Sequence, residues 1–187
     1  MNTKVDTACI AQAVKVLENG GLIAYPTEGV FGIGCDPQNE TALARVIAIK
    51  QRDAAKGLIL VADQLEQLTA FVQPFTAEEY KRIAPTWPGP VTWVVRAKPD
   101  VSSLLTGGRH TLAVRISDHP VVQSLCRSFG GAIVSTSANL SGQPACLSAA
   151  QTKVQLGEKI ELVIDAATGE HQGASTIRDA ATGERLR

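Results

Sequence analysis

Residues 39–61 have the sequence NETALARVIAIKQRDAAKGLILV, and this stretch indicates the class of fold. In its first half, apolar side chains recur at helical spacing behind Asn39, a residue type that commonly caps helix N-termini. Its last four residues form an uninterrupted apolar run, which is typical of a strand buried on both faces. We therefore expect a helix, a loop and a buried strand in direct succession, as in an α/β domain.

The loop between this helix and this strand concentrates positive charge. Lys50, Arg52 and Lys56 fall within seven residues of a chain whose 18 basic and 18 acidic residues cancel. Lysine offers a point charge and arginine a planar fork of donors, a combination suited to a polyphosphate. The alternative is a solvated helix end, at which the cations only oppose the helix dipole.

Outward from this stretch, predicted helices and strands alternate along the chain. Helices are expected at 7–17, 39–49, 76–83, 120–129 and 148–156, with a further one capped by Asp63 and carrying Leu65 and Leu68. Strands are expected at 22–25, 58–61, 91–95, 111–116, 132–134 and 161–164, with two more in the tail between residues 175 and 187. This order predicts one α/β domain over residues 1–187, and the tail pair favours a twisted, mixed sheet over a purely parallel one.

Further stretches carry residues suited to a ligand. Residues 26–34, PTEGVFGIG, place three glycines among small polar side chains, which predicts a loop whose backbone approaches a ligand or a turn between core elements. Residues 135–142, STSANLSG, follow a predicted strand, where ligands bind in open α/β sheets; helix caps and turn bonds are the alternative. Arg115 lies in an apolar strand and needs a carboxylate partner, from the protein or from a substrate.

Composition narrows the class of protein. Hydrophobic residues make up 44% of the 187 residues and charged residues 19%, as is ordinary for a globular domain. The four cysteines are widely spaced and form no C-x-x-C pair, so neither a zinc site nor a redox motif is predicted. The N-terminus lacks a signal-peptide pattern and no apolar run is long enough to cross a bilayer, so we expect a cytoplasmic protein without a membrane partner.

Several common catalytic arrangements are missing from the sequence. It contains no G-x-S-x-G elbow, no H-E-x-x-H motif and no histidine or cysteine cluster at metal-ligand spacing, so no metal-binding residues are predicted. The three histidines fall in separate predicted loops. The residues alone therefore indicate a nucleotide-binding α/β domain and no particular reaction.

Taken together, these motifs resemble the YrdC-like family of threonylcarbamoyl-AMP synthases, in its short single-domain bacterial form. The resemblance covers essentially the whole chain, and its motifs occur in the family's order and spacing. They are Pro26–Glu28 with Val30–Gly34, Lys50–Arg52, Ala113–Arg115 with His119–Pro120, Ser135–Gly142, and Ser175–Ile177.

The resemblance implies a twisted mixed sheet enclosing a concave basic cavity, and a reaction. L-threonine, bicarbonate or carbon dioxide, and ATP with Mg²⁺ would give threonylcarbamoyl-AMP and pyrophosphate, with no permanently bound cofactor. Partner proteins of a threonylcarbamoyl-transferase complex would then modify adenosine 37 of tRNA, and the basic cavity would allow a contact with tRNA.

The resemblance also assigns roles to individual residues. Lys50 and Arg52 would be catalytic, and the residues facing ATP would be Lys50, Arg52, Lys56, Thr111, Asn139 and Arg187. The residues facing threonine would be Thr27, Arg115, Ser137 and Ser175. The chain departs from longer relatives at Asp53 and Gly57, where they carry prolines, at Val61, where they carry a histidine, and at Leu147, where some carry a polar nucleotide contact.

Two other functions compete with this interpretation. A double-stranded RNA- or tRNA-binding module would use Lys50, Arg52, Arg109, Arg115 and Arg178 for phosphodiesters, although no aromatic residues interleave with these cations. The other competing function is that of a carbamoyl-adenylating domain of the kind used in hydrogenase maturation. Such domains normally belong to much larger chains.

Overall fold

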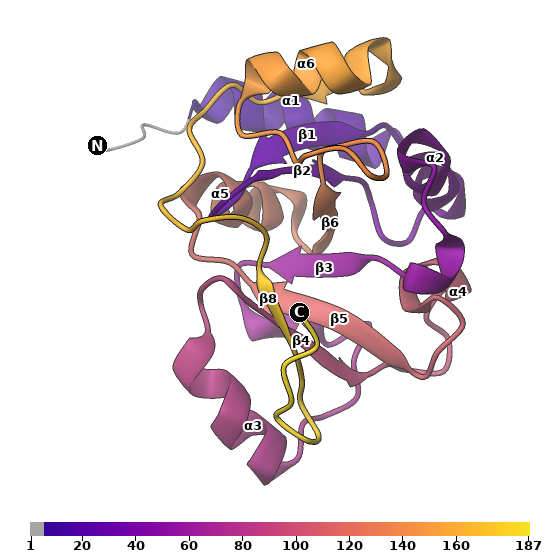
Figure 1. The fold of residues 1–187 in the computed structure, drawn as a ribbon, viewed down its shortest axis with the longest axis vertical. Coiled ribbons are helices and arrows are strands. Elements are labelled where there is room, and N and C mark those ends of the chain that lie inside the picture. Colours follow the sequence, from indigo (N-terminus) through magenta and orange to yellow (C-terminus); the bar gives the residue numbers. More distant parts are fainter. Residues whose placement is uncertain (1–5) are drawn as a thin grey trace.

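The computed structural model describes residues 6–187, which form an eight-stranded mixed sheet with helices packed against it (Figure 1). The strands are β1 (Ile23–Pro26), β2 (Phe31–Gly34), β3 (Ile59–Ala62), β4 (Val91–Arg96), β5 (Thr111–Ile116), β6 (Ile133–Ser137), β7 (Leu162–Val163) and β8 (Thr176–Asp179). They lie in the order β7-β1-β2-β6-β3-β5-β4-β8. The pairs β1–β7, β3–β5 and β4–β8 are parallel, and the other neighbouring pairs are antiparallel. The predicted mixed α/β sheet is therefore confirmed.

The α-helices connect these strands. They are α1 (Thr7–Glu18), α2 (Glu40–Lys50), α3 (Ala77–Ile83), α4 (Ser103–Thr106), α5 (Pro120–Phe129) and α6 (Ala149–Leu156). Short 3-10 turns occur at η1 (Ala54–Lys56), η2 (Leu65–Leu68), η3 (Ala84–Thr86) and η4 (Gly157–Lys159). Within residues 6–187, no helix combines the length and the apolar character needed to cross a membrane.

The pleat of the strands separates two hydrophobic cores. Ile23 and Tyr25 of β1 face α1 and α5, in a cluster that also holds Val61 and Ile133. The residues alternating with them, such as Ala24, face a larger cluster that includes α2 and the buried Trp93. Because side chains alternate along a strand, each apolar run serves both cores, as expected for strands buried on both faces.

The stretch at residues 39–61 folds as its pattern predicts. The Asn39 side chain accepts a hydrogen bond from the backbone N–H of Ala42 at the start of α2, at a distance of 3.0 Å. Gln51 ends α2 in the left-handed conformation, with φ of 50°, so the chain turns sharply into the basic loop. The loop contains η1, whose N-terminus Asp53 caps, and then leads into β3.

Four predicted elements differ from the structure. Residues 31–34 form strand β2, not part of a loop, and β6 extends to Ser137, so the polar side chains of Ser135 and Ser137 lie on a strand. Asp63 does not cap a helix: the turn after it is 3-10 without a side-chain cap, and Asp63 instead pairs with Arg127 at 2.9 Å. The second tail strand is reduced to an isolated bridge between Arg178 and Arg185.

Candidate active site

A cavity of about 440 Å³ lies on the part of the sheet that α1 and α5 leave uncovered. Its floor belongs to the same pleated face as the core beneath those helices: on β6, Ile133 packs in the core while Ser135 and Ser137 line the cavity. On β3 the same change occurs from Val61 to Ile59. Sheet register brings the floor together, because Ile59 pairs with both Ser135 and Ala113.

Two loops form one wall of the cavity. The turn between β1 and β2 is held by the amide and the hydroxyl of Thr27, which both donate to the carbonyl of Val30. A side chain at Gly29 would overlap the carbonyl oxygens of His171 and Gly173, so glycine is required where this turn meets the loop before β8. The two loops thus pack backbone against backbone, and both line the cavity.

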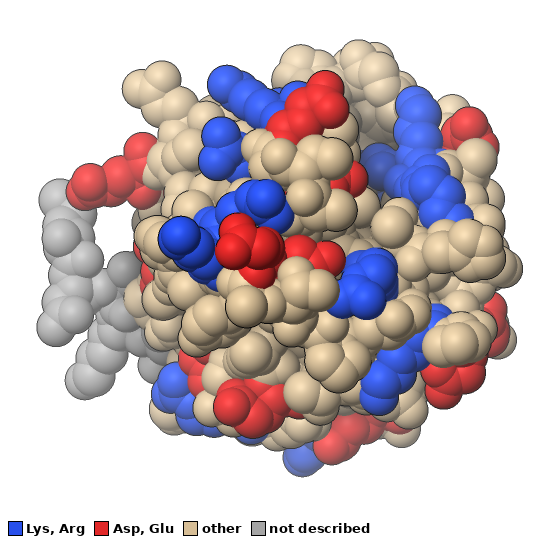
Figure 2. Space-filling model, turned by 90° about the horizontal axis from the view of Figure 1, so that it is seen from below, with Lys and Arg blue, Asp and Glu red and all other residues tan. Residues whose placement is uncertain are grey.

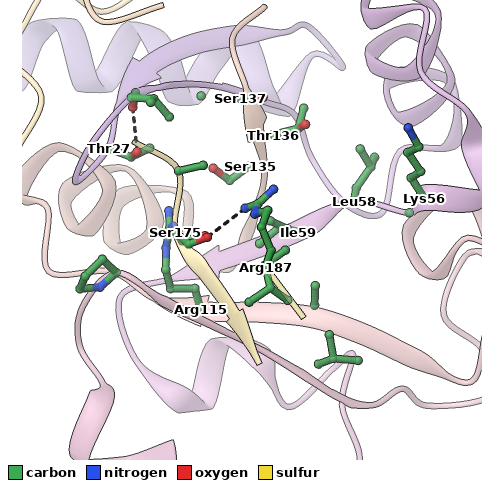
Figure 3. A pocket seen from close by; sticks show the side chains of 18 of the residues that line it. Thr27, Lys56, Leu58, Ile59, Arg115, Ser135, Thr136, Ser137, Ser175 and Arg187 are labelled. Carbon is green, nitrogen blue, oxygen red and sulfur yellow. Dashed lines mark hydrogen bonds between the residues drawn. The ribbon is translucent and has the colours of Figure 1, made fainter. Parts of the chain in front are cut away.

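Cationic side chains from distant parts of the chain surround this cavity. They are Arg52 and Lys56 from the basic loop, Arg109 from the loop before β5, Arg115 from β5, and Arg187. Figure 3 shows Lys56 on the side of the basic loop, and Arg187 beside Ser175, with its guanidinium donating to the Ser175 carbonyl at 3.0 Å. The basic loop, strand β5 and the tail therefore contribute cations to one cavity.

The cations lie close enough to affect one another. Burial, followed by the charge of Arg109, lowers the pKa of Arg52, and the Nε atom of Arg52 is buried without a hydrogen-bond partner among residues 6–187. Burial, followed by the charges of Arg52 and Arg115, lowers the pKa of Arg187. Guanidinium groups that disfavour one another in this way would be stabilised by a bound anion.

Arg115 has a carboxylate partner within the protein. Its guanidinium lies 3.2 Å from the Oε2 atom of Glu28, and each side chain is only 6% exposed. The other oxygen of Glu28 accepts a hydrogen bond of 2.8 Å from the hydroxyl of Ser117. Sequence reasoning left open whether this partner belonged to the protein or to a substrate, and it did not single out Glu28. The only available signal was Glu28 following Thr27 in a glycine-rich turn.

Lys50 and Asn139 do not line the cavity, although both were predicted to contact ATP. The Lys50 ammonium is buried and donates to the carbonyl of Ser137, to the carbonyl of Asn139 at 2.9 Å and to the Asn139 side chain at 3.0 Å. Ser137 also donates to the Asn139 side chain, at 2.6 Å. Lys50 therefore holds the end of β6, and Ser137 alone of these three lines the cavity. Burial, followed by the charge of Arg52, lowers the pKa of Lys50 to about 8.

The remaining predicted site residues line the cavity: Thr27, Lys56, Thr111 and Ser175. The Ser175 hydroxyl shares a hydrogen bond of 2.8 Å with Thr92, so β8 and β4 fix its position. Arg109, Ser135 and the loop from His171 to Ala174 also line the cavity without having been predicted as substrate contacts. Arg109 was named only for RNA binding, and nothing in its sequence context indicated its place in this wall.

The surface shows no continuous basic band on the face drawn in Figure 2, where acidic and basic side chains are interspersed. Arg178, one of the cations considered for RNA binding, lies over the ring of Trp93 at 5.7 Å from its centroid and does not line the cavity. Lys50 is also directed elsewhere. The set of cations expected to hold a phosphodiester backbone is therefore not assembled in one place.

Comparison with known proteins identifies the family. The family model Sua5_yciO_yrdC, described as telomere recombination, matches residues 15–187. A threonylcarbamoyl-AMP synthase of Vibrio vulnificus is 49% identical over 180 residues, covering 95% of this chain and 97% of the relative. One of Klebsiella pneumoniae is 48% identical over 189 residues, covering 100% and 99%.

A solved structure shows the same fold. The crystal structure of P. abyssi Sua5 complexed with L-threonine superposes with a TM-score of 0.91 at 31% identity. It covers 97% of this chain, which spans about half, 54%, of that longer chain. The fold, the family model and the near full-length sequence relatives agree, and the chain belongs to the Sua5/YciO/YrdC family.

Proposed function

We propose that this protein is a threonylcarbamoyl-AMP synthase, which converts L-threonine, bicarbonate and ATP to threonylcarbamoyl-AMP and pyrophosphate. The observation that carries the proposal is one cavity in which four cationic side chains surround a half-buried space while a fifth, Arg115, lies at its base beside a carboxylate. This chain matches the bacterial relatives that carry this name over nearly their full length.

The chemistry requires positioning more than a reactive side chain. The threonine nitrogen forms a bond to the carbon of carbon dioxide, or of bicarbonate with loss of water, and gives up a proton. An oxygen of the resulting carbamate attacks the α-phosphorus of ATP, and the bond to pyrophosphate breaks. In-line placement and neutralised phosphate charge supply the catalysis, without a covalent enzyme intermediate.

The two ends of the cavity suit the two substrates. Arg52, Lys56, Arg109 and Arg187 would hold the triphosphate, while Thr111 and the apolar floor would face the nucleoside. Arg115 would pair with the threonine carboxylate, and Thr27, Ser137 and Ser175 would complete that pocket. Lys50 and Asn139 would act by fixing the end of β6, whose Ser137 lines the cavity.

Other participants follow from the reaction. Mg²⁺ would enter with ATP, coordinated mainly by phosphate oxygens and water as this ion prefers. Threonylcarbamoyl-AMP is a mixed anhydride, so a cytoplasmic threonylcarbamoyl-transferase complex that modifies adenosine 37 of tRNA would consume it.

Pyrophosphate release by the purified protein tests the proposal. We expect release that requires L-threonine and bicarbonate together with ATP. Arg52→Ala should reduce kcat/KM by about tenfold to a hundredfold, because a charge-assisted hydrogen bond contributes roughly 1.5–3 kcal/mol. Arg45→Ala is the matched control: Arg45 lies on the preceding helix and pairs with Glu161 outside the cavity. Release that ignores threonine, or equal losses in both variants, would contradict the proposal.

A further inference from the structure

The carboxylate of Glu28 makes the base of the cavity electrically different from its rim. Glu28 and Arg115 form a buried pair whose formal charges cancel. Around the rim, Arg52, Lys56 and Arg109 line the cavity with no ion pair to a carboxylate within residues 6–187. Because a buried site with unopposed positive charge attracts any anion, the cavity needs a feature that keeps a polyphosphate away from Arg115.

Glu28 is held in place from several sides. Its Oε1 atom accepts from the Ser117 hydroxyl, and the Ser117 oxygen in turn accepts from the backbone N–H of His119 at 3.2 Å, where α5 begins. The Glu28 carbonyl accepts from the backbone N–H of His171 at 3.0 Å. The carboxylate therefore cannot swing away when a ligand enters, and its charge stays beside Arg115.

The pair also leaves hydrogen-bonding capacity unused. The Arg115 Nε atom and the Glu28 Oε2 atom are buried without a hydrogen-bond partner among the described residues. One is a donor for a carboxylate and the other an acceptor for an ammonium or amine. Small shifts of both groups toward an entering ligand would satisfy the two ends of a zwitterion, whereas a polyphosphate could satisfy only Arg115 and would meet the negative charge of Glu28.

We propose that Glu28 is a specificity-determining residue, which reserves the Arg115 end of the cavity for an amino acid by repelling polyphosphate. The proposal rests on the function proposed above, in which Arg115 binds the threonine carboxylate. Two carboxylates, Glu28 and Asp179, are among the residues that line the cavity, and Glu28 is the one that pairs with Arg115. In the wild-type protein, polyphosphate should therefore compete with ATP and leave L-threonine binding unaffected.

Inorganic tripolyphosphate is the probe that tests this role. In the wild type, tripolyphosphate should compete with ATP in a direct binding measurement that does not depend on pyrophosphate release. The dissociation constant of L-threonine, measured by calorimetry, should not change. In Glu28→Gln, which keeps the size of the side chain but removes its charge, tripolyphosphate should raise the apparent dissociation constant of L-threonine at least about tenfold, since a close charge pair is worth more than 1.4 kcal/mol.

Two controls separate charge from position. Ser117→Ala removes the hydrogen bond to Glu28 but keeps its charge, so tripolyphosphate should remain without effect on threonine binding. Glu28→Asp keeps the charge on a shorter side chain; threonine binding should weaken while tripolyphosphate exclusion persists. If Glu28 had a purely structural role, Glu28→Gln, Glu28→Asp and Ser117→Ala would each weaken the binding of L-threonine and of ATP to the same extent.

The outcomes distinguish this proposal from the proposed function. If the wild type releases pyrophosphate only with threonine, but tripolyphosphate competes with threonine in the wild type or fails to do so in Glu28→Gln, the role of Glu28 is wrong and the synthase assignment stands. If Glu28→Gln does not fold, the wild type and Glu28→Asp still test the proposal, because competition between tripolyphosphate and L-threonine in either protein would overturn it. If the wild type neither binds threonine nor needs it for turnover, the proposed function itself fails.

Discussion

Ile133 and Ser137, at the two ends of strand β6, point to the same face of the sheet but have different surroundings. Ile133 is fully buried beneath α1 and α5, while Ser137, four residues later, lines an open cavity. The backbone is the same regular strand at both points. The difference therefore comes from what covers the sheet: where helices cover it the face is core, and where they stop the face is available to a ligand (Figure 1).

This difference shows how the cavity obtains its charges. No single element carries them: the basic loop, the turn between β1 and β2, strand β5 and the tail each contribute side chains to the uncovered half. The covered half supplies rigidity, since β3, β5 and β6 continue from the core into the cavity floor. A site built on strands anchored in a packed core keeps its geometry better than one built on loops alone.

Arg115→Ala should produce the largest effect, because Arg115 both lines the cavity and balances the charge of a buried carboxylate. Removing it leaves Glu28 buried without its counter-charge, which should lower the free energy of unfolding by about 3–5 kcal/mol. In the remaining folded protein the apparent KM for L-threonine should rise far more than that for ATP. Denaturant unfolding and initial rates check both parts, and equal changes in the two KM values would contradict the assignment of Arg115 to threonine.

A matched pair of substitutions on β6 should separate the two halves. Ile133→Ala should cost about 2–5 kcal/mol of unfolding free energy and leave both KM values unchanged, because it removes only core packing. Ser137→Ala should cost about 0.5–1.5 kcal/mol, the loss of its hydrogen bond to Asn139, and should raise the KM for L-threonine. If Ile133→Ala altered substrate affinity as much as Ser137→Ala did, the division of this face into core and site would be wrong.

A pH-dependent effect is expected for Lys50, at the boundary between the halves. Its pKa is lowered to about 8 in the folded protein, from an ordinary value of 10.5, chiefly by burial and then by Arg52. Between these values the unfolded chain binds the proton more strongly, so this group's contribution to the free energy of unfolding should increase as the pH rises from 8 toward 10.5. Below pH 8 both states carry the charge and the contribution is constant.

Unfolding curves at about pH 7 and about pH 9.5 check this, with Lys50→Met as the reference. The stability of the wild type relative to Lys50→Met should be greater at the higher pH. Identical differences at the two pH values would show that the pKa of Lys50 is the same in both states.

Much of the fold was predictable from local patterns. The helix behind Asn39, the helix expected at 76–83 and the strand at 111–116 are encoded by nearby residues and are confirmed. Strand β2 was not predicted, because its glycines resemble a loop. The reason for Gly34 is tertiary: a side chain there would overlap the ring of Tyr25 on the paired strand.

The sequence predicted which residues belong to the site better than it predicted how those residues are arranged. Sequence motifs selected residues that the structure does bring to one cavity, such as Arg52 and Ser175. They could not indicate that the Lys50 ammonium points to the end of β6, because its direction depends on where β6 ends. Nor could they pair Glu28 with Arg115, since 87 positions separate the two along the chain and only the sheet brings them together.

Tracing labelled bicarbonate into product tests most directly the central claim, that two substrates meet on the uncovered half of the sheet. The protein would be incubated with L-threonine, MgATP and ¹³C-bicarbonate, and the adenylated product analysed by mass spectrometry. The account predicts a threonylcarbamoyl adenylate that carries the label and forms only when all three substrates are present. An unlabelled threonyl adenylate, or pyrophosphate release without any threonine-containing product, would contradict it.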